Sequence, residues 1–135
     1  MKHLIFIFLL LVAWTSNGFC RELNAKVSSV INAYRHFDCN NIEQNEVANE
    51  LLFELIQDKS LCRFLMAIEN DTLVQKNILI ELENPIDDSI NLEQCSNNLL
   101  KYKEKYKVVL PMLEAIKRAQ KKSEPSIHSE KSDKL

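Results

Sequence analysis

The feature that most constrains this chain is its lack of glycine. The only glycine, Gly18, lies near the N-terminus, and residues 19–135 contain none. Phosphate-binding loops, dinucleotide-binding fingerprints and nucleophile elbows all need glycine, because their backbones take positive φ or approach a ligand closely. Two-residue hairpin turns are left with Asn or Asp alone, which disfavours a sandwich or barrel of many strands. The sequence therefore excludes these nucleotide-binding and hydrolase motifs and favours helices.

The N-terminal segment 1–18 has the pattern of a secretory signal peptide. Lys2 precedes an unbroken apolar run over residues 4–13, and these 10 residues are about half of what a membrane span needs. Ser16 and Gly18 put small residues at the −3 and −1 positions of a cleavage site. We therefore expect cleavage after Gly18 and a secreted, extracellular protein without a membrane span.

Cysteine usage agrees with secretion. Cleavage after Gly18 leaves Cys20, Cys39, Cys62 and Cys95. An even number of cysteines in an oxidising compartment indicates two disulfides. The gaps between them are 19, 23 and 33 residues, so no C-x2-C pair is present and we expect no zinc site.

Apolar residues recur at helical spacing through most of the remaining chain. The spacing predicts helices over 21–37 and 44–57, a third helical region over 61–82 that is bent or broken at 70–72, and a fourth helix over 92–122 that is kinked at Pro111. The tail over 123–135 is almost free of apolar residues and is expected to be disordered. The predicted fold is all-α: a small, disulfide-stapled, up-down bundle of four helices, or of five if the third region is broken, formed by residues 19–122.

The predicted topology also selects a disulfide pairing. Short links make successive helices antiparallel, so Cys20 and Cys62 lie at one end of the bundle and Cys39 and Cys95 at the other. A third helix of about 20 residues would separate the two ends by roughly 30 Å, whereas bridged Cα atoms lie within about 7 Å. We therefore expect the bridges Cys20–Cys62 and Cys39–Cys95.

Candidate catalytic groups are few. Only His36 and His128 remain after cleavage; His128 lies in the tail, and His36 suits the negative end of the first helix dipole. Glu81 and Glu83 resemble a carboxylate pair, but acidic residues at such positions are typical of a solvated surface. We expect no enzymatic activity, no cofactor and no metal.

Charge is distributed unevenly along the chain. Residues 21–100 carry 6 basic and 14 acidic side chains, whereas residues 101–122 carry 8 basic and 2 acidic ones. A solvated helix end with favourably placed cations is one interpretation. The other is an electrostatic surface for an acidic extracellular protein or a sulfated polysaccharide, since nucleic acid does not suit an exported, acidic chain. The partner-binding residues predicted in this way are Lys101, Lys105, Lys117, Arg118, Lys121 and Lys122.

The third helical region contains an N-glycosylation sequon. Asn70-Asp71-Thr72 has the N-x-T pattern, so Asn70 is a candidate for glycosylation where this segment is exposed. The motif alone is weakly specific.

In outline the chain is similar to a family of anopheline salivary proteins that includes anophensin and albicin. The similarity consists of a signal peptide, a short mature chain, four cysteines and only helices, and no motif matches residue by residue. That family interferes with host plasma cascades, either the contact (kallikrein–kinin) system or the alternative complement pathway. The resemblance implies a secreted, non-enzymatic inhibitor that binds a plasma protease or a complement complex.

Two other classes remain open. The stretch from Cys39 to Cys62, with Ser60-Leu61-Cys62-Arg63, resembles the cysteine-bearing loop and helix of interleukin-4-like short-chain cytokines, which would imply a cell-surface receptor as partner. The short links near 38–43, 58–60 and 84–90 disfavour that up-up-down-down topology, which needs two long crossovers. A helical carrier of a small apolar ligand is the third class; odorant-binding proteins of this kind generally have six cysteines.

Overall fold

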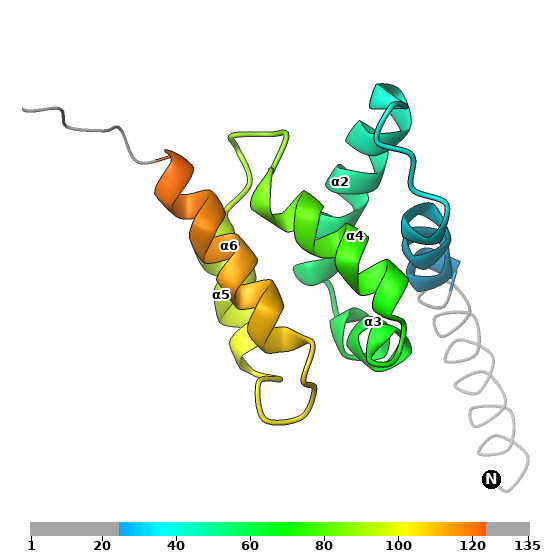
Figure 1. Cartoon of the computed structure of the whole chain (residues 1–135). Helices are drawn as coiled ribbons and strands as arrows, with labels where there is room; N and C mark the ends of the chain where they lie inside the picture. The colour runs from blue at the N-terminus through cyan, green and yellow to red at the C-terminus, as the bar shows by residue number, and fades with distance from the viewer. Residues whose placement is uncertain (1–24, 124–135) are drawn as a thin grey trace, which may run out of the picture.

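The structure, a computed structural model, describes residues 25–123, which are helical apart from short connections (Figure 1). No strand occurs among them, which confirms an all-α fold for this part of the chain. The predicted signal peptide, Cys20 and residues 124–135 of the predicted tail lie outside the described residues. The helices are a first helical segment over residues 25–35, α2 (Ile42–Ile56), α3 (Leu61–Ile68), α4 (Thr72–Glu83), α5 (Leu92–Leu100) and α6 (Val109–Ser123).

Asn and Asp side chains begin three of these helices. The side-chain oxygens of Asn41, Asp71 and Asn91 each accept a hydrogen bond from the backbone N–H three residues further on, over 3.2, 3.1 and 2.9 Å. Such N-caps satisfy donors that have no partner inside the helix. No residue from 25 to 123 has positive φ, so these turns form without the backbone conformation that glycine supplies.

The third helical region is broken at residues 69–71, with α3 on one side and α4 on the other. Asp71 caps α4 and also forms an ion pair with Arg35, whose Nη2 lies 2.7 Å from the Asp71 Oδ2. Gln75 Nε2 donates to two carbonyl oxygens at the end of α3, over 2.7 and 2.8 Å. The polar groups on both sides of the break are thus paired, which stabilises the turn.

The predicted fourth helix over 92–122 is wrong. Two helices, α5 and α6, occupy this region, and residues 101–108 form turns between them. In a continuous helix the ring of Pro111 would clash with the carbonyl of residue 107. In the first turn of a new helix its missing N–H requires no partner. Pro111 therefore lies near the start of α6 and does not kink a longer helix.

The charges of residues 101–107 and a hydrogen-bonding carboxylate also favour the interruption between α5 and α6. On a continuous helix Lys101 and Lys105, and likewise Lys103 and Lys107, would stand four residues apart, where like charges destabilise a helix. In the structure the carboxylate of Glu69 accepts hydrogen bonds from the backbone N–H of Lys107 and of the next residue, over 2.9 and 3.3 Å. Two donors just before α6 are thereby satisfied by a side chain from the end of α3.

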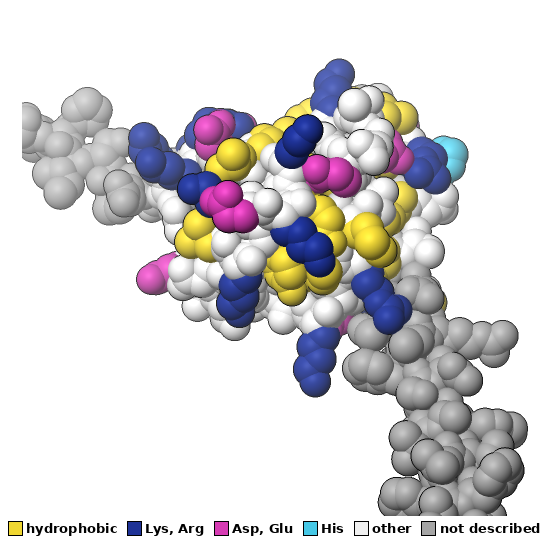
Figure 2. Space-filling view, turned by 90° about the horizontal axis from the view of Figure 1, so that it is seen from below, with side chains coloured by type: hydrophobic (Ala, Val, Ile, Leu, Met, Phe, Trp, Pro, Cys, Tyr) yellow, Lys and Arg dark blue, Asp and Glu magenta, His cyan; other side chains and the backbone are white. Residues whose placement is uncertain are grey.

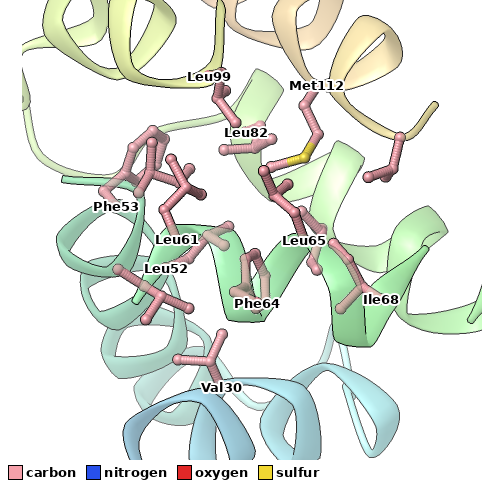
Figure 3. Packing of buried hydrophobic residues seen from close by; sticks show 14 of the residues in the cluster. Val30, Leu52, Phe53, Leu61, Phe64, Leu65, Ile68, Leu82, Leu99 and Met112 are labelled. Atoms are coloured by element: carbon pink, nitrogen blue, oxygen red, sulfur yellow. The ribbon is translucent and has the colours of Figure 1, made fainter. Parts of the chain in front are cut away.

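One hydrophobic core joins the described helices, with α3 in its middle (Figure 3). Phe64 of α3 is fully buried, and Val30 of the first helical segment lies on one side of it. On the other side lie Leu82 of α4, Leu99 of α5 and Met112 of α6. The core therefore connects the first helical segment with the C-terminal helices through α3.

The helix lengths differ from those predicted. The helices from α2 to α6 are 8 to 15 residues long, and α6 packs chiefly against α4 and α5, away from the first helical segment (Figure 1). Six helical segments over residues 25–123 replace the predicted four or five. No helix in this range is both long and apolar enough to cross a bilayer.

Candidate functional site

The structure divides the predicted partner-binding cations into two groups. Lys101 and Lys105 lie in the turns before α6, and the other four, Lys117, Arg118, Lys121 and Lys122, lie in its last turns. Helix α6 has 15 residues and therefore spans roughly 20 Å. The six cations therefore lie at opposite ends of α6 and do not form one continuous helix face.

The group at the end of α6 is partly neutralised. Arg118 Nε lies 2.9 Å from Glu83 Oε2, and Lys122 Nζ lies 3.3 Å from Glu83 Oε1. The hydrogen bond from Arg118 and the nearby Lys122 hold the pKa of Glu83 below its usual value. Lys117 and Lys121 are exposed and have no ion pair with any described residue. Only half of this group is thus free of an acidic partner.

The turns before α6 concentrate more unpaired positive charge. We call residues 101–108 the cationic loop; it contains four lysines and one glutamate. All four lysines, Lys101, Lys103, Lys105 and Lys107, are exposed. None of them has a carboxylate within ion-pair distance among residues 25–123. Their positive charge is therefore not neutralised by a carboxylate in the described part of the chain.

The cationic loop is held against α3 at two points. The Cys62 Sγ lies 3.5 Å from the Tyr106 hydroxyl and 3.7 Å from Lys105 Nζ. Seven residues after Cys62, Glu69 directly follows α3 and accepts the two backbone hydrogen bonds described above. The aromatic ring of Tyr106 also lies 5.2 Å below Lys105 Nζ and 6.3 Å from the ring of Tyr102. These contacts give the loop a defined conformation.

Met66 lies between these two points. On a helix, residues 62, 66 and 69 fall on one face because they are four and three positions apart. Met66 is 64% exposed although both of its neighbours on this face contact the loop. We define the α3–loop face by the exposed Met66 of α3 and by Tyr102, Lys103, Lys105 and Lys107 of the loop that is held against α3. Seen from below the view of Figure 1, the molecule shows hydrophobic side chains near the middle, with Lys and Arg side chains among and around them and several Asp or Glu side chains beside them (Figure 2).

Sequence reasoning missed three parts of this surface: Met66, the Cys62–Tyr106 contact and the cap from Glu69. The lysines at every second position from 101 to 107, followed by Pro111, were a sequence signal for a loop, because like charges four residues apart and a proline both disfavour a continuous helix over this segment. No sequence signal connects α3 to the loop, since those contacts span 38 to 44 residues.

The other candidate groups do not converge on a catalytic site. Glu81 is buried and Glu83 is ion-paired at the surface, so they do not form a carboxylate pair facing one space. His36 is exposed just after the first helical segment. Asn70 is exposed in the turn between α3 and α4, so the sequon is accessible and its glycosylation stays a prediction. Within residues 25–123, no three His, Cys, Asp or Glu side chains are placed to hold a metal ion.

The three described cysteines, Cys39, Cys62 and Cys95, are free thiols, and Cys20 lies outside the described residues. Cys39 and Cys95 are not bridged in the structure, and the predicted Cys20–Cys62 bridge involves a residue outside the described part of the chain. Cys39 is exposed before α2, whereas Cys95 is fully buried in α5, where burial raises the pKa of its thiol to about 11. The predicted pairing assumed an unbroken third helix that separates two ends of a bundle. The break between α3 and α4 removes that premise.

Comparisons with known proteins leave the family open. No family model matches this chain, and no curated protein or solved structure is significantly similar to it. The resemblances to salivary inhibitors and to short-chain cytokines stay predictions from the sequence.

Proposed function

We propose that this chain is a secreted, non-enzymatic protein that binds an acidic surface of an extracellular host protein through the α3–loop face. The observation that carries the proposal is the cationic loop. Its four exposed lysines lack acidic partners in the described part of the chain. The loop is held against α3, which carries the exposed Met66.

Charge at the rim and an apolar centre have different roles in protein recognition. Unpaired lysines steer an acidic partner toward the surface and raise the association rate. Methionine and aromatic side chains are enriched at the centres of protein interfaces, where burial slows dissociation. Met66 with Tyr102 supplies such a centre, and Lys103, Lys105 and Lys107 supply the rim.

The same features favour a protein over a sulfated polysaccharide. A polyanion needs only an array of cations, and the strength of such binding follows charge and salt. The α3–loop face adds an exposed thioether, held between two tertiary contacts, which a sulfated sugar does not use. The more detailed proposal is a salivary inhibitor of a plasma cascade, in which the acidic partner is a complement complex or a contact-system protease. That detail is supported by the outline resemblance alone.

The test compares how strongly the full secreted chain and two charge variants inhibit the alternative complement pathway and the contact system. Lysis through the alternative complement pathway and contact activation of plasma are measured with increasing protein. Lys103→Ala with Lys107→Ala removes two charges from the α3–loop face. Lys117→Ala with Lys121→Ala removes two equally exposed charges from the far end of α6, so it is the matched control.

We expect inhibition of one cascade, with association to its target slowed by about three- to tenfold in the loop variant and nearly unchanged in the control. Equal losses in both variants would mean that only overall charge matters. Binding to heparin without inhibition of either cascade would replace the protein partner with a polysaccharide.

A further inference from the structure

A second surface of the molecule has the opposite charge. A cavity of about 430 Å³ lies between α2 and the loop over residues 84–91. Its volume falls in the range of about 300–1,000 Å³ that small-molecule sites occupy. The loop over 84–91 lies at the top of the molecule in Figure 1, whereas α3 and the cationic loop lie at the bottom, so the two surfaces are on opposite sides of the molecule. The cavity shares no residue with the α3–loop face.

A buried asparagine fixes the two walls of this cavity. Asn49 of α2 is fully buried, and its Nδ2 donates to the carboxylate of Glu81 over 2.8 Å. Its Oδ1 accepts from the backbone N–H of Ile86 in the loop, over 3.3 Å. Asp87 Oδ1 in turn accepts from the backbone N–H of Ser89, over 2.7 Å, which closes a tight turn in the loop. The cavity is thus preformed, and a ligand need not order its walls.

The rim of the cavity is negative. Glu46, Glu50 and Glu54 recur every four residues along one face of α2, and Asp87 lies on the loop side. Glu54 is ion-paired with Lys26, over 2.5 Å, whereas the other three carboxylates have no cationic partner among residues 25–123. Hydrogen bonds from Ser89 hold the pKa of Asp87 below its usual value, so this carboxylate is ionised well below neutral pH.

The floor of the cavity is apolar. Phe53 of α2 lines it from below, and Ile86 and Ile90 line it from the loop. Ile86 is 51% exposed, and this large aliphatic side chain lines the same cavity as the four carboxylates. Burying this side chain against a ligand removes apolar surface from water, which favours a ligand with an apolar body.

The geometry points to a binding site for a small organic ammonium ion with a short apolar body. The ammonium group would lie between Glu50 and Asp87 at the rim, and the apolar body would cover Ile86 and Ile90. A divalent metal ion fits less well, because no three carboxylates converge in the described part of the chain. This inference is independent of the proposed protein partner, because it rests on other residues.

Isothermal titration of the full chain with phenethylamine tests the site. This probe carries an ammonium group on an aromatic body, and phenethyl alcohol is a close neutral analogue. We expect saturable one-to-one binding of phenethylamine at low salt and about tenfold weaker binding of phenethyl alcohol. Methylammonium, which has the charge without the apolar body, is expected to bind about tenfold more weakly as well.

Three variants localise the binding. Glu50→Gln removes a rim charge and is expected to weaken phenethylamine binding by about fivefold. Glu43→Gln removes the same charge from the first turn of α2, outside the cavity, and is the matched control with a change below about twofold. Ser89→Trp places a bulky ring at the exposed loop position and is expected to abolish binding, with circular dichroism showing an unchanged helix content.

Several outcomes would overturn the proposal. One is that titration with phenethylamine gives no saturable heat. Another is that phenethyl alcohol binds with the same affinity as phenethylamine. A third is that Glu50→Gln and Glu43→Gln weaken phenethylamine binding equally. Competition of Ca²⁺ with the amine at equal concentration would assign the carboxylates to a metal ion. Retention of full affinity in Ser89→Trp with intact fold would place the amine elsewhere.

Discussion

Glu69 at the end of α3 accepts a hydrogen bond from the backbone N–H of Lys107, 38 residues later in the chain, over 2.9 Å. Its second oxygen accepts from the N–H of the following residue. Helix α6 therefore receives its capping carboxylate from another helix, whereas α2, α4 and α5 are capped by their own preceding residue. This contact fixes where the cationic loop ends and how it lies against α3.

Removing this carboxylate is expected to destabilise the protein. Glu69→Ala leaves two backbone donors before α6 without their partner, and we expect the free energy of unfolding to fall by about 1–2 kcal/mol. Urea unfolding followed by circular dichroism measures the change. Glu114→Ala on α6 removes an exposed carboxylate that has no hydrogen bond or ion pair with residues 25–123, and it should change stability by less than about 0.5 kcal/mol. A loss in Glu69→Ala no larger than in this control would contradict the capping role.

The sequence predicted the helical parts of the fold because they depend on local patterns. Val30 and Tyr34 follow the helical spacing of the first segment and are buried as that spacing predicts. Asp71 follows the N-cap preference and begins α4. These features need only a few neighbouring residues, so periodicity and capping rules can identify them.

Prediction failed where a tertiary contact replaced a local one. Tyr102 and Tyr106 keep helical spacing with α5, yet they lie in turns, because Glu69 supplies a cap from a distant helix and Pro111 begins a new helix. Helical spacing also favours Val47 as a core residue of α2, but it is 57% exposed while Asn49 is fully buried. Asn49 is buried because it pairs with Glu81 and the loop at 84–91, which the sequence of α2 cannot reveal.

Stability should depend on pH through Glu81. Burial raises the pKa of Glu81 above its usual value, and the hydrogen bond from Asn49 offsets only part of this effect. The folded state then holds the proton more tightly than the unfolded chain, so this group contributes stability below the unfolded pKa, and the contribution is lost as pH rises through the folded pKa. The nearby Tyr34 hydroxyl stays neutral over this range, because burial raises its pKa.

The comparison of Glu81→Gln with the unchanged chain isolates this contribution. Glutamine keeps an oxygen that accepts from Asn49 but does not ionise. We expect its free energy of unfolding, relative to the unchanged chain, to increase from pH 4 to pH 7. Urea unfolding at both pH values measures the difference. A relative stability that stays constant or decreases over this range would show that the buried carboxyl does not titrate as the structure indicates.

Thiol accessibility should follow burial. Cys39 is exposed, Cys62 is half-buried beside Tyr106, and Cys95 is fully buried with a raised pKa. Because the thiolate reacts, iodoacetamide should alkylate Cys39 first, Cys62 more slowly and Cys95 only after unfolding. Peptide mapping by mass spectrometry assigns each site. Alkylation of Cys95 in the native protein at the rate of Cys39 would contradict its burial, and a bridged peptide containing Cys39 and Cys95 would restore the pairing predicted from the sequence.

Met66 should control dissociation from the partner more than association. Its side chain is 64% exposed on the α3–loop face, so its truncation removes apolar contact area without changing charge. Apolar anchors at an interface centre act mainly on the dissociation rate, whereas rim charges act on association. We expect Met66→Ala to raise the dissociation rate by about tenfold in surface plasmon resonance with the inhibited target.

Ile42→Ala is the control for this prediction. It truncates a 71% exposed side chain at the start of α2, away from this face, and should leave both rates unchanged. Equal dissociation rates for Met66→Ala and Ile42→Ala would exclude the α3–loop face as the centre of the contact, even if the lysines still steer association.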